Sequence, residues 1–199
     1  MEGSYFYWVS WFLWIVYTFF APKNHVRLRI CLYILLLITL SAHGITIYSF
    51  HISFAYILML IVSYSFVMKQ TGTAFIYFSF ASASVTMLYA AFHFLLLFDP
   101  VWAFVEATWL LVFVLLFASF ALYRSFDERL LVLTVGCCQG DFLYAFVLKQ
   151  FSFPHSIGSL SFLDGWALAT VCLFLWKWLE QLPIYIDARF QKRAKEANT

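Results

Sequence analysis

Three ionisable side chains lie within long apolar stretches of this sequence and could do chemistry there: His93, Glu106 and Asp141. Ionisable groups are costly in hydrocarbon, so those inside membrane segments are by default functional candidates. An imidazole and two carboxylates could together bind a cation or relay protons, and His93 with Glu106 is an acid/base pair. The alternative is an internal role, in which the groups satisfy one another and fix the register of the helices.

The positions of these groups within the predicted helices allow them to meet. His93 lies about five residues before the end of one apolar stretch, and Glu106 about five residues into the next, on the two sides of Asp99-Pro100. If these two helices pair as an antiparallel hairpin, both side chains lie at one depth. Asp141 lies beside Gln139 in the middle or outer half of a later stretch. We therefore expect a candidate ion or proton site that opens outward.

The uncharged stretches that carry these residues set the number of membrane spans. Hydrophobic residues make up 64% of the 199 residues and charged residues only 11%, against about 25% in soluble domains. The 39 residues between Arg29 and Lys69 contain no charged side chain, which is about twice what one helix needs to cross a bilayer. We predict an all-α transmembrane helix bundle, one domain over 1–199 with about seven spans: 5–21, 29–41, 53–68, 73–98, 101–123, 130–148 and 163–184.

The basic residues orient this bundle. Cytoplasmic loops are enriched in Lys and Arg. If the gap 22–29 is cytoplasmic, Lys149 alone lies in an outer loop, and ten basic residues lie inside: Lys23, Arg27, Arg29, Lys69, Arg124, Arg129, Arg189, Lys192, Arg193 and Lys195. We therefore expect the N-terminus outside and the C-terminus inside. The acidic start Met1-Glu2 lacks the basic region of a signal peptide, so we expect the first span to be retained.

Lys177 is the remaining basic residue and lies within the last span, between Trp176 and Trp178. A lysine that extends its ammonium group to the interface beside tryptophans explains this position. Seven spans with a lysine in the last one also resemble microbial rhodopsins, which carry an Asp four residues before the retinal lysine. Leu173 occupies that position here, so we expect no retinal and no other cofactor.

The sequence contains no pattern typical of an enzyme or a metal site. The four cysteines have no ligand spacing and are expected to act as small buried side chains. His43, His51 and His155 are expected to be solvated in outer loops, and no metal site is predicted. Phosphate-loop and hydrolase motifs are absent, and the basic residues are too dispersed for nucleic acid. We therefore expect a protein that is not an enzyme.

Two features indicate what the protein contacts. Small residues at 81–84 and at Gly136 and Gly140 permit close approach of helices, either within the bundle or with a membrane-protein partner or second copy. The basic tail Ala188-Arg-Phe-Gln-Lys-Arg-Ala-Lys-Glu is expected to attract anionic lipids, by about 1 kcal/mol per basic side chain near the surface. The lipid bilayer itself is the remaining expected partner.

The opening Met1-Glu-Gly-Ser-Tyr5-Phe-Tyr7-Trp8-Val-Ser-Trp11, the overall length and the basic tail resemble the YphA family of Bacillus-type membrane proteins. This resemblance implies a small multi-pass protein of the cytoplasmic membrane of endospore-forming bacteria, with a role in sporulation. It transfers no catalytic or binding residue to this chain. The leading hypothesis is a non-enzymatic membrane scaffold or envelope component, and the alternative is a small proton- or cation-coupled transporter that uses His93, Glu106 and Asp141.

Overall fold

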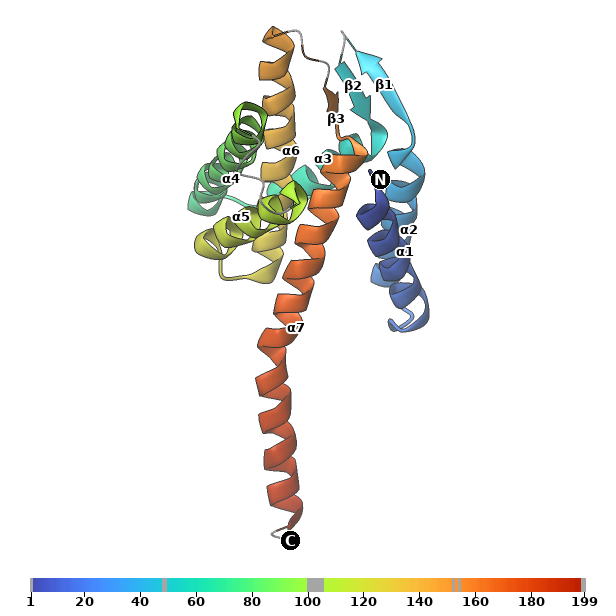
Figure 1. Ribbon diagram of the computed structural model, residues 1–199. Coiled ribbons are helices and arrows are strands. Elements are labelled where there is room, and N and C mark those ends of the chain that lie inside the picture. Colours follow the sequence, from blue (N-terminus) through green and yellow to red (C-terminus); the bar gives the residue numbers. More distant parts are fainter. Residues whose placement is uncertain (1, 48–49, 100–105, 152, 154, 198–199) are drawn as a thin grey trace.

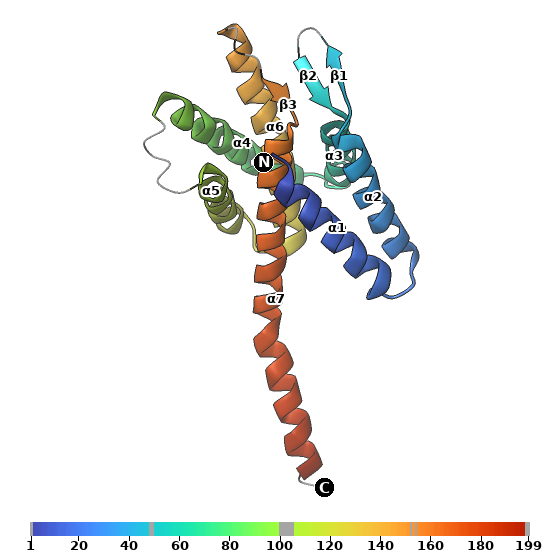
Figure 2. The ribbon, with the colours of Figure 1, turned by 45° about the vertical axis from the view of Figure 1, so that its right-hand side comes forward.

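The computed structural model describes residues 2–47, 50–99, 106–151, 153 and 155–197, with side chains up to Leu182. Seven helices account for most of this part of the chain: α1 (Ser4–Phe19), α2 (His25–Ser41), α3 (Phe54–Val67), α4 (Thr73–Phe98), α5 (Ala107–Leu122), α6 (Phe126–Gln150) and α7 (Leu160–Ala197). α6 lies at the centre, where it packs against α3, α4, α5 and α7, while α1 packs between α2 and α7 (Figures 1 and 2).

Helix length divides these elements into two groups. By length and composition, three helical segments could cross a membrane: Thr73–Phe98, Phe126–Gln150 and Leu160–Leu182. The other four helices have 14 to 17 residues, or about 21 to 26 Å at 1.5 Å per residue. They are therefore shorter than the hydrocarbon core of about 30 Å.

A small sheet corrects the prediction of an all-α fold. Strands β1 (Gly44–Ile47) and β2 (Phe50–Ser53) form an antiparallel hairpin, and β3 (Ser156–Ile157) adds to β2 in parallel, with His51 opposite Ser156. β-branched Ile45, Thr46, Ile47 and Ile52 favour extended backbone because their χ1 angles are restricted. The sheet lies at one end of the molecule, and the C-terminus of α7 lies at the other (Figure 1).

The structure also moves several expected helix boundaries: α2 begins at His25 instead of residue 29, and α6 begins at Phe126 instead of residue 130. The changes in α5 and α7 matter more. α5 begins at Ala107, so Glu106 precedes the helix instead of lying about five residues within a span; residues 101–105 of that expected span lie outside the described part. The carbonyl of Glu106 accepts the first intrahelical hydrogen bond, from the Trp109 N–H at 3.0 Å. At the other end of the chain, α7 begins at Leu160 and continues to Ala197, well past the other helices (Figure 2).

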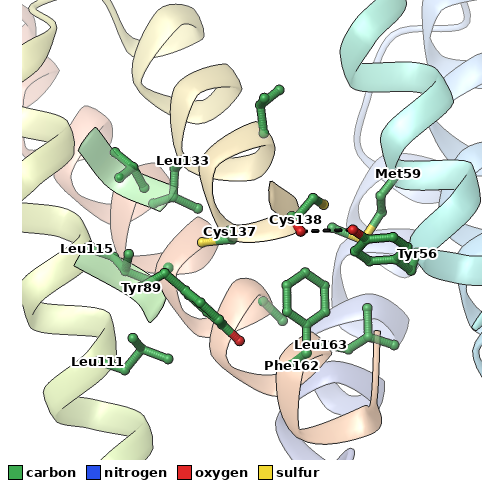
Figure 3. Close-up of a cluster of buried hydrophobic side chains, with 14 of the residues drawn as sticks. Tyr56, Met59, Tyr89, Leu111, Leu115, Leu133, Cys137, Cys138, Phe162 and Leu163 are labelled. Atoms are coloured by element: carbon green, nitrogen blue, oxygen red, sulfur yellow. Dashed lines mark hydrogen bonds between the residues drawn. The ribbon is translucent and has the colours of Figure 1, made fainter. Parts of the chain in front are cut away.

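Close packing of α4 against α6 forms the centre of the core. A Cβ added to Gly136 would lie 2.5 Å from the Val85 side chain, and one added to Gly140 would lie 2.7 Å from Tyr89 Cβ. The predicted small-residue face of α6 therefore serves the protein's own bundle. Around it, buried side chains from α3, α4, α5 and the start of α7 converge on α6, and the Tyr56 hydroxyl donates to the Cys138 carbonyl at 2.8 Å (Figure 3).

Candidate polar site around Asp141

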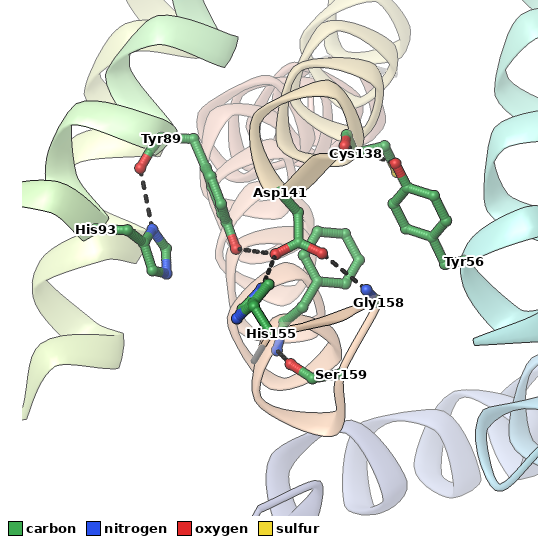
Figure 4. Close-up of polar contacts among 9 residues, drawn as sticks. Tyr56, Tyr89, His93, Cys138, Asp141, His155, Gly158 and Ser159 are labelled. Carbon is green, nitrogen blue, oxygen red and sulfur yellow. Dashed lines mark hydrogen bonds and ion pairs between the residues drawn. The ribbon is translucent and has the colours of Figure 1, made fainter. Parts of the chain in front are cut away.

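Asp141 is the most buried ionisable group among the predicted site residues, at 1% exposure on α6. Its Oδ2 accepts a hydrogen bond from the backbone N–H of Gly158 at 2.7 Å. Its Oδ1 accepts from the Tyr89 hydroxyl at 3.5 Å and lies 3.2 Å from His155 Nε2 (Figure 4). The carboxylate therefore has a partner on each oxygen, as a buried charge requires.

The chain that brings Gly158 to Asp141 returns from the end of α6 to the start of α7. Pairing of β3 with β2 holds this return segment in place. Gly158 has a φ of +69°, and an added Cβ would also collide with the Tyr56 side chain. Only glycine suits this position without strain. The N–H that binds Asp141 is thus positioned by backbone geometry that the sequence specifies locally.

His93 joins this cluster through aromatic neighbours. Its ring stacks on Tyr89, with 4.3 Å between ring centroids, and its Nδ1 lies 3.0 Å from the Tyr89 carbonyl oxygen. Tyr144 on α6 contacts both histidines, with ring centroids 5.1 Å from His93 and 5.0 Å from His155. The expected association of His93 with Asp141 is therefore indirect. The Tyr89 ring stacks on His93, and the Tyr89 hydroxyl donates to Asp141.

Glu106 lies elsewhere. Its side chain is exposed before α5, and its Oε2 accepts a hydrogen bond from the Tyr5 hydroxyl of α1 at 3.4 Å. Among the described contacts, none joins Glu106 to His93 or Asp141. Two of the three predicted site residues thus share a neighbour, and the third contacts a different helix.

His155 is the residue that reasoning from the sequence missed. It was expected to be solvated, yet it lies against Asp141 with 23% of its side chain exposed. The sequence carried only a weak signal of this position. In Pro154-His-Ser-Ile-Gly158, a turn glycine follows the histidine by three residues. His43 and His51 are exposed, as predicted. Within the described ranges, no group of three or more His, Cys, Asp or Glu side chains could hold a metal ion.

Asp164 on α7 forms a second buried carboxylate contact. It is 6% exposed, and its two oxygens accept hydrogen bonds from the backbone N–H groups of Gly3 and Phe6, each at 2.7 Å. The first N–H groups of a helix lack partners within the helix and carry partial positive charge. Asp164 therefore caps α1 from a neighbouring helix, a contact across 161 residues that no local pattern signals.

Arg129 and Lys177 make contacts at the opposite end of the bundle. Arg129, 9% exposed on α6, donates to the Tyr123 carbonyl at 2.7 Å and lies 3.6 Å from Glu180 of α7. The half-buried Lys177 places its ammonium group 4.0 Å from the centre of the Phe126 ring. These contacts join the start of α6 to α7 at the end expected to face the cytoplasm.

Comparison with known proteins identifies the family. A family model described as "YphA-like integral membrane protein" matches residues 2–199. The chain belongs to this family. It is therefore an integral membrane protein, and the resemblance found in the sequence is confirmed.

A curated relative has similar length. "Uncharacterized protein YphA" of Bacillus subtilis (strain 168) is 27% identical over 201 residues, which cover 99% of this chain and 98% of the relative. No solved structure matches the chain. A role in sporulation stays a prediction.

Proposed function

We propose that this protein is a non-enzymatic scaffold in the bacterial cytoplasmic membrane, and that its buried carboxylates hold the bundle together. The observation that carries the proposal is the hydrogen bonding of Asp141 and Asp164. Asp141 binds the backbone N–H of Gly158, and Asp164 binds those of Gly3 and Phe6, all through short contacts of 2.7 Å. Carboxylates engaged in this way lock helices to connecting segments, which is the role a rigid membrane platform needs.

The proposed platform crosses the membrane seven times, with its N-terminus outside. The ten basic residues assigned to the inner side support this topology. Large apolar side chains face outward even on the short helices: Trp8 of α1 is 78% exposed, and Phe113 and Phe117 of α5 are each 70% exposed. Apolar surface of this extent fits contact with lipid, and local thinning of the bilayer accommodates helices shorter than its core.

The last helix gives the scaffold its cytoplasmic contact surface. α7 continues about 22 Å beyond Leu182, at 1.5 Å per residue for the 15 residues to Ala197. This extension, residues 183–197, carries Arg189, Lys192, Arg193 and Lys195. We expect this extension to bind anionic lipid of the inner leaflet, or an acidic membrane protein at that surface. The electrostatic attraction is screened beyond about 8 Å at physiological salt, so the partner must lie close to the basic side chains.

One observation favours a second candidate function, a proton- or cation-coupled carrier. His155 contacts the buried Asp141 and is partly exposed, so it connects the carboxylate to the outer side. A partly exposed imidazole can serve as a proton shuttle. This candidate requires a matching path from Asp141 toward the cytoplasm.

Flux measurements on purified protein in liposomes separate the two functions. With a pH gradient and a membrane potential imposed in turn, the scaffold predicts proton and cation fluxes equal to those of empty liposomes. The matched comparison is Asp141→Asn. A flux that wild-type protein supports and Asp141→Asn abolishes would establish the carrier instead.

A further inference from the structure

A polar crevice lies beside the sheet, at the end of the molecule that is expected to face outward. Its volume is about 230 Å³, far larger than the roughly 10–15 Å³ that one buried water occupies. The side chains that define its chemistry come from four separate segments: Glu2, His43, His51, Ser53, Ser156 and Ser159. Asp141 and His93 do not line it, but Gly158, whose N–H binds Asp141, does, so the crevice adjoins the polar site described above.

Ser53 is the unusual member of this lining. It occupies the N-cap position of α3, where a serine normally accepts a hydrogen bond from the first turn, yet its side chain makes no capping bond. Ser53 is 5% exposed, and its buried Oγ has no hydrogen-bond partner within the described part of the chain. A buried hydroxyl without a partner is costly, so a rotation of the Ser53 side chain toward the crevice would let a ligand supply the missing hydrogen bond.

Helix ends give the crevice a positive potential. α3 begins directly after Ser53 and α7 directly after Ser159, and both residues line the crevice. The N-terminus of a helix favours anions through its dipole and its unpaired N–H groups. α1 also begins nearby, but Asp164 already occupies its Gly3 and Phe6 N–H groups. At the other two helix ends, the Phe54 N–H of α3 already donates to the His43 carbonyl at 3.0 Å, and the Phe162 N–H of α7 donates to Ser159 Oγ at 3.3 Å. The positive character therefore comes from the dipoles and the other first-turn N–H groups of α3 and α7, and the imidazoles of His43 and His51 can donate further hydrogen bonds.

Glu2 adds an exposed carboxylate to this lining. It would repel a simple anion but attract an ammonium group next to one. A phosphate ester that carries an ammonium group satisfies both parts of the crevice: phosphate oxygens toward Ser53 and the helix ends, and the ammonium group toward Glu2. Because α1, α3 and α7 all begin beside the crevice, it lies at the level where membrane helices meet lipid headgroups.

We propose that this crevice binds a phosphate group, with the ethanolamine-phosphate headgroup of an outer-leaflet lipid as its source. The lipid source rests on the proposed topology, in which this end of the molecule faces outward, whereas phosphate binding in the crevice can succeed or fail independently of the scaffold role. Free phosphate has the same anionic chemistry and is distinguished by the test.

The test measures binding to full-length protein in phosphate-free maltoside detergent by calorimetry, with glycerophosphoethanolamine and inorganic phosphate as separate probes. Ser53→Ala is the diagnostic variant, because the Ser53 hydroxyl makes no bond within the described protein and its removal should leave the unfolding midpoint unchanged or raise it. Ser65→Ala, at the other end of α3, is the matched control, since Ser65 Oγ donates only to the Val62 carbonyl. Glu2→Gln tests the ammonium contact.

The proposal predicts that wild-type protein binds glycerophosphoethanolamine more tightly than phosphate. Ser53→Ala should bind glycerophosphoethanolamine about tenfold more weakly than wild-type protein does, and Ser65→Ala should bind it with wild-type affinity. Glu2→Gln should remove the preference for the headgroup over phosphate. Equal binding of both probes to wild-type protein would overturn the lipid source and assign the site to free phosphate. Absence of binding, or equal binding to wild-type protein and Ser53→Ala, overturns the site itself, as does a lower unfolding midpoint in Ser53→Ala without a change in affinity.

Discussion

The carboxylate of Asp141 accepts a hydrogen bond from the backbone N–H of Gly158 at 2.7 Å and so ties the middle of α6 to the segment that leads into α7. Gly158 reaches this position with a left-handed backbone, beside a strand that pairs with β2. The same carboxylate is approached by Tyr89 of α4. One side chain therefore connects two helices and the segment that follows β3, which gives an ionisable residue a structural role in the core of the bundle.

The contact between α4 and α6 depends on glycine. We expect Gly140→Ala to lower the free energy of unfolding by about 1–3 kcal/mol, because the new methyl group would overlap Tyr89. Gly165→Ala in α7 is the matched control: its Cβ would lie 3.5 Å from Leu111, an ordinary contact, and alanine favours helix. Thermal unfolding in detergent measures both. Equal losses in the two variants would show that close packing at Gly140 is unimportant.

The cap that Asp164 provides should hold the start of α1. Asp164→Ala leaves the N–H groups of Gly3 and Phe6 without their acceptor, and we expect a loss of about 1–2 kcal/mol. Hydrogen exchange locates the effect: amides of residues 3–7 should exchange faster in the variant, while those of α4 stay as in wild-type protein. Unchanged exchange at residues 3–7 would contradict the capping role.

The proposed topology predicts which added cysteines react in intact cells. Thr46→Cys in β1 should react with a membrane-impermeant maleimide, whereas Thr71→Cys between α3 and α4, and Ser125→Cys before α6, should react only after lysis. The native chain, whose cysteines are all buried or partly buried, provides the background. Labelling of Thr71→Cys in intact cells would require a different number of crossings.

The basic extension of α7 should respond to lipid charge. We expect a spin label at Gln191→Cys to be less mobile in nanodiscs with phosphatidylglycerol than in phosphatidylcholine alone. Replacing Arg189, Lys192, Arg193 and Lys195 with Gln should abolish this difference, as should 1 M salt, which shortens the screening length to about 3 Å. Equal mobility in both lipids would leave an acidic protein as the partner of the extension.

Helices could be predicted from the sequence where a long uncharged apolar stretch is enough to define them. α4 has the bounds 73–98 that its uncharged stretch predicted, and the glycine spacing predicted the close face of α6. The hairpin was missed because its residues lie in the same uncharged stretch as two helices. There the alternation in Ile45-Thr46-Ile47 and Phe50-His51-Ile52 was the only local signal.

The polar site was harder to predict because its contacts join distant segments. His93 and Asp141 are recognisable as ionisable groups in apolar stretches. Near His155 the sequence offers only the weak signal of a turn glycine, which does not show that β3 would place the histidine beside Asp141. Glu106 was assigned by depth alone, whereas the start of α5 at Ala107 places it outside the helix. Depth along a span can be predicted from a sequence; rotation about the helix axis and the path of a connecting segment depend on packing.

The structural role of Asp141 is tested most directly by the thermal unfolding of Asp141→Leu and Asp141→Asn in detergent, with the exposed Asp127→Asn as the control. Leucine leaves the Gly158 N–H and His155 without an acceptor, so we predict a loss of about 1–3 kcal/mol for each unpaired group. The Asp141→Asn variant should lose less, because the amide oxygen of its side chain can still accept from Gly158. Asp127→Asn should change stability by less than about 0.5 kcal/mol. An unfolding midpoint of Asp141→Leu at or above that of wild-type protein would contradict this structural role.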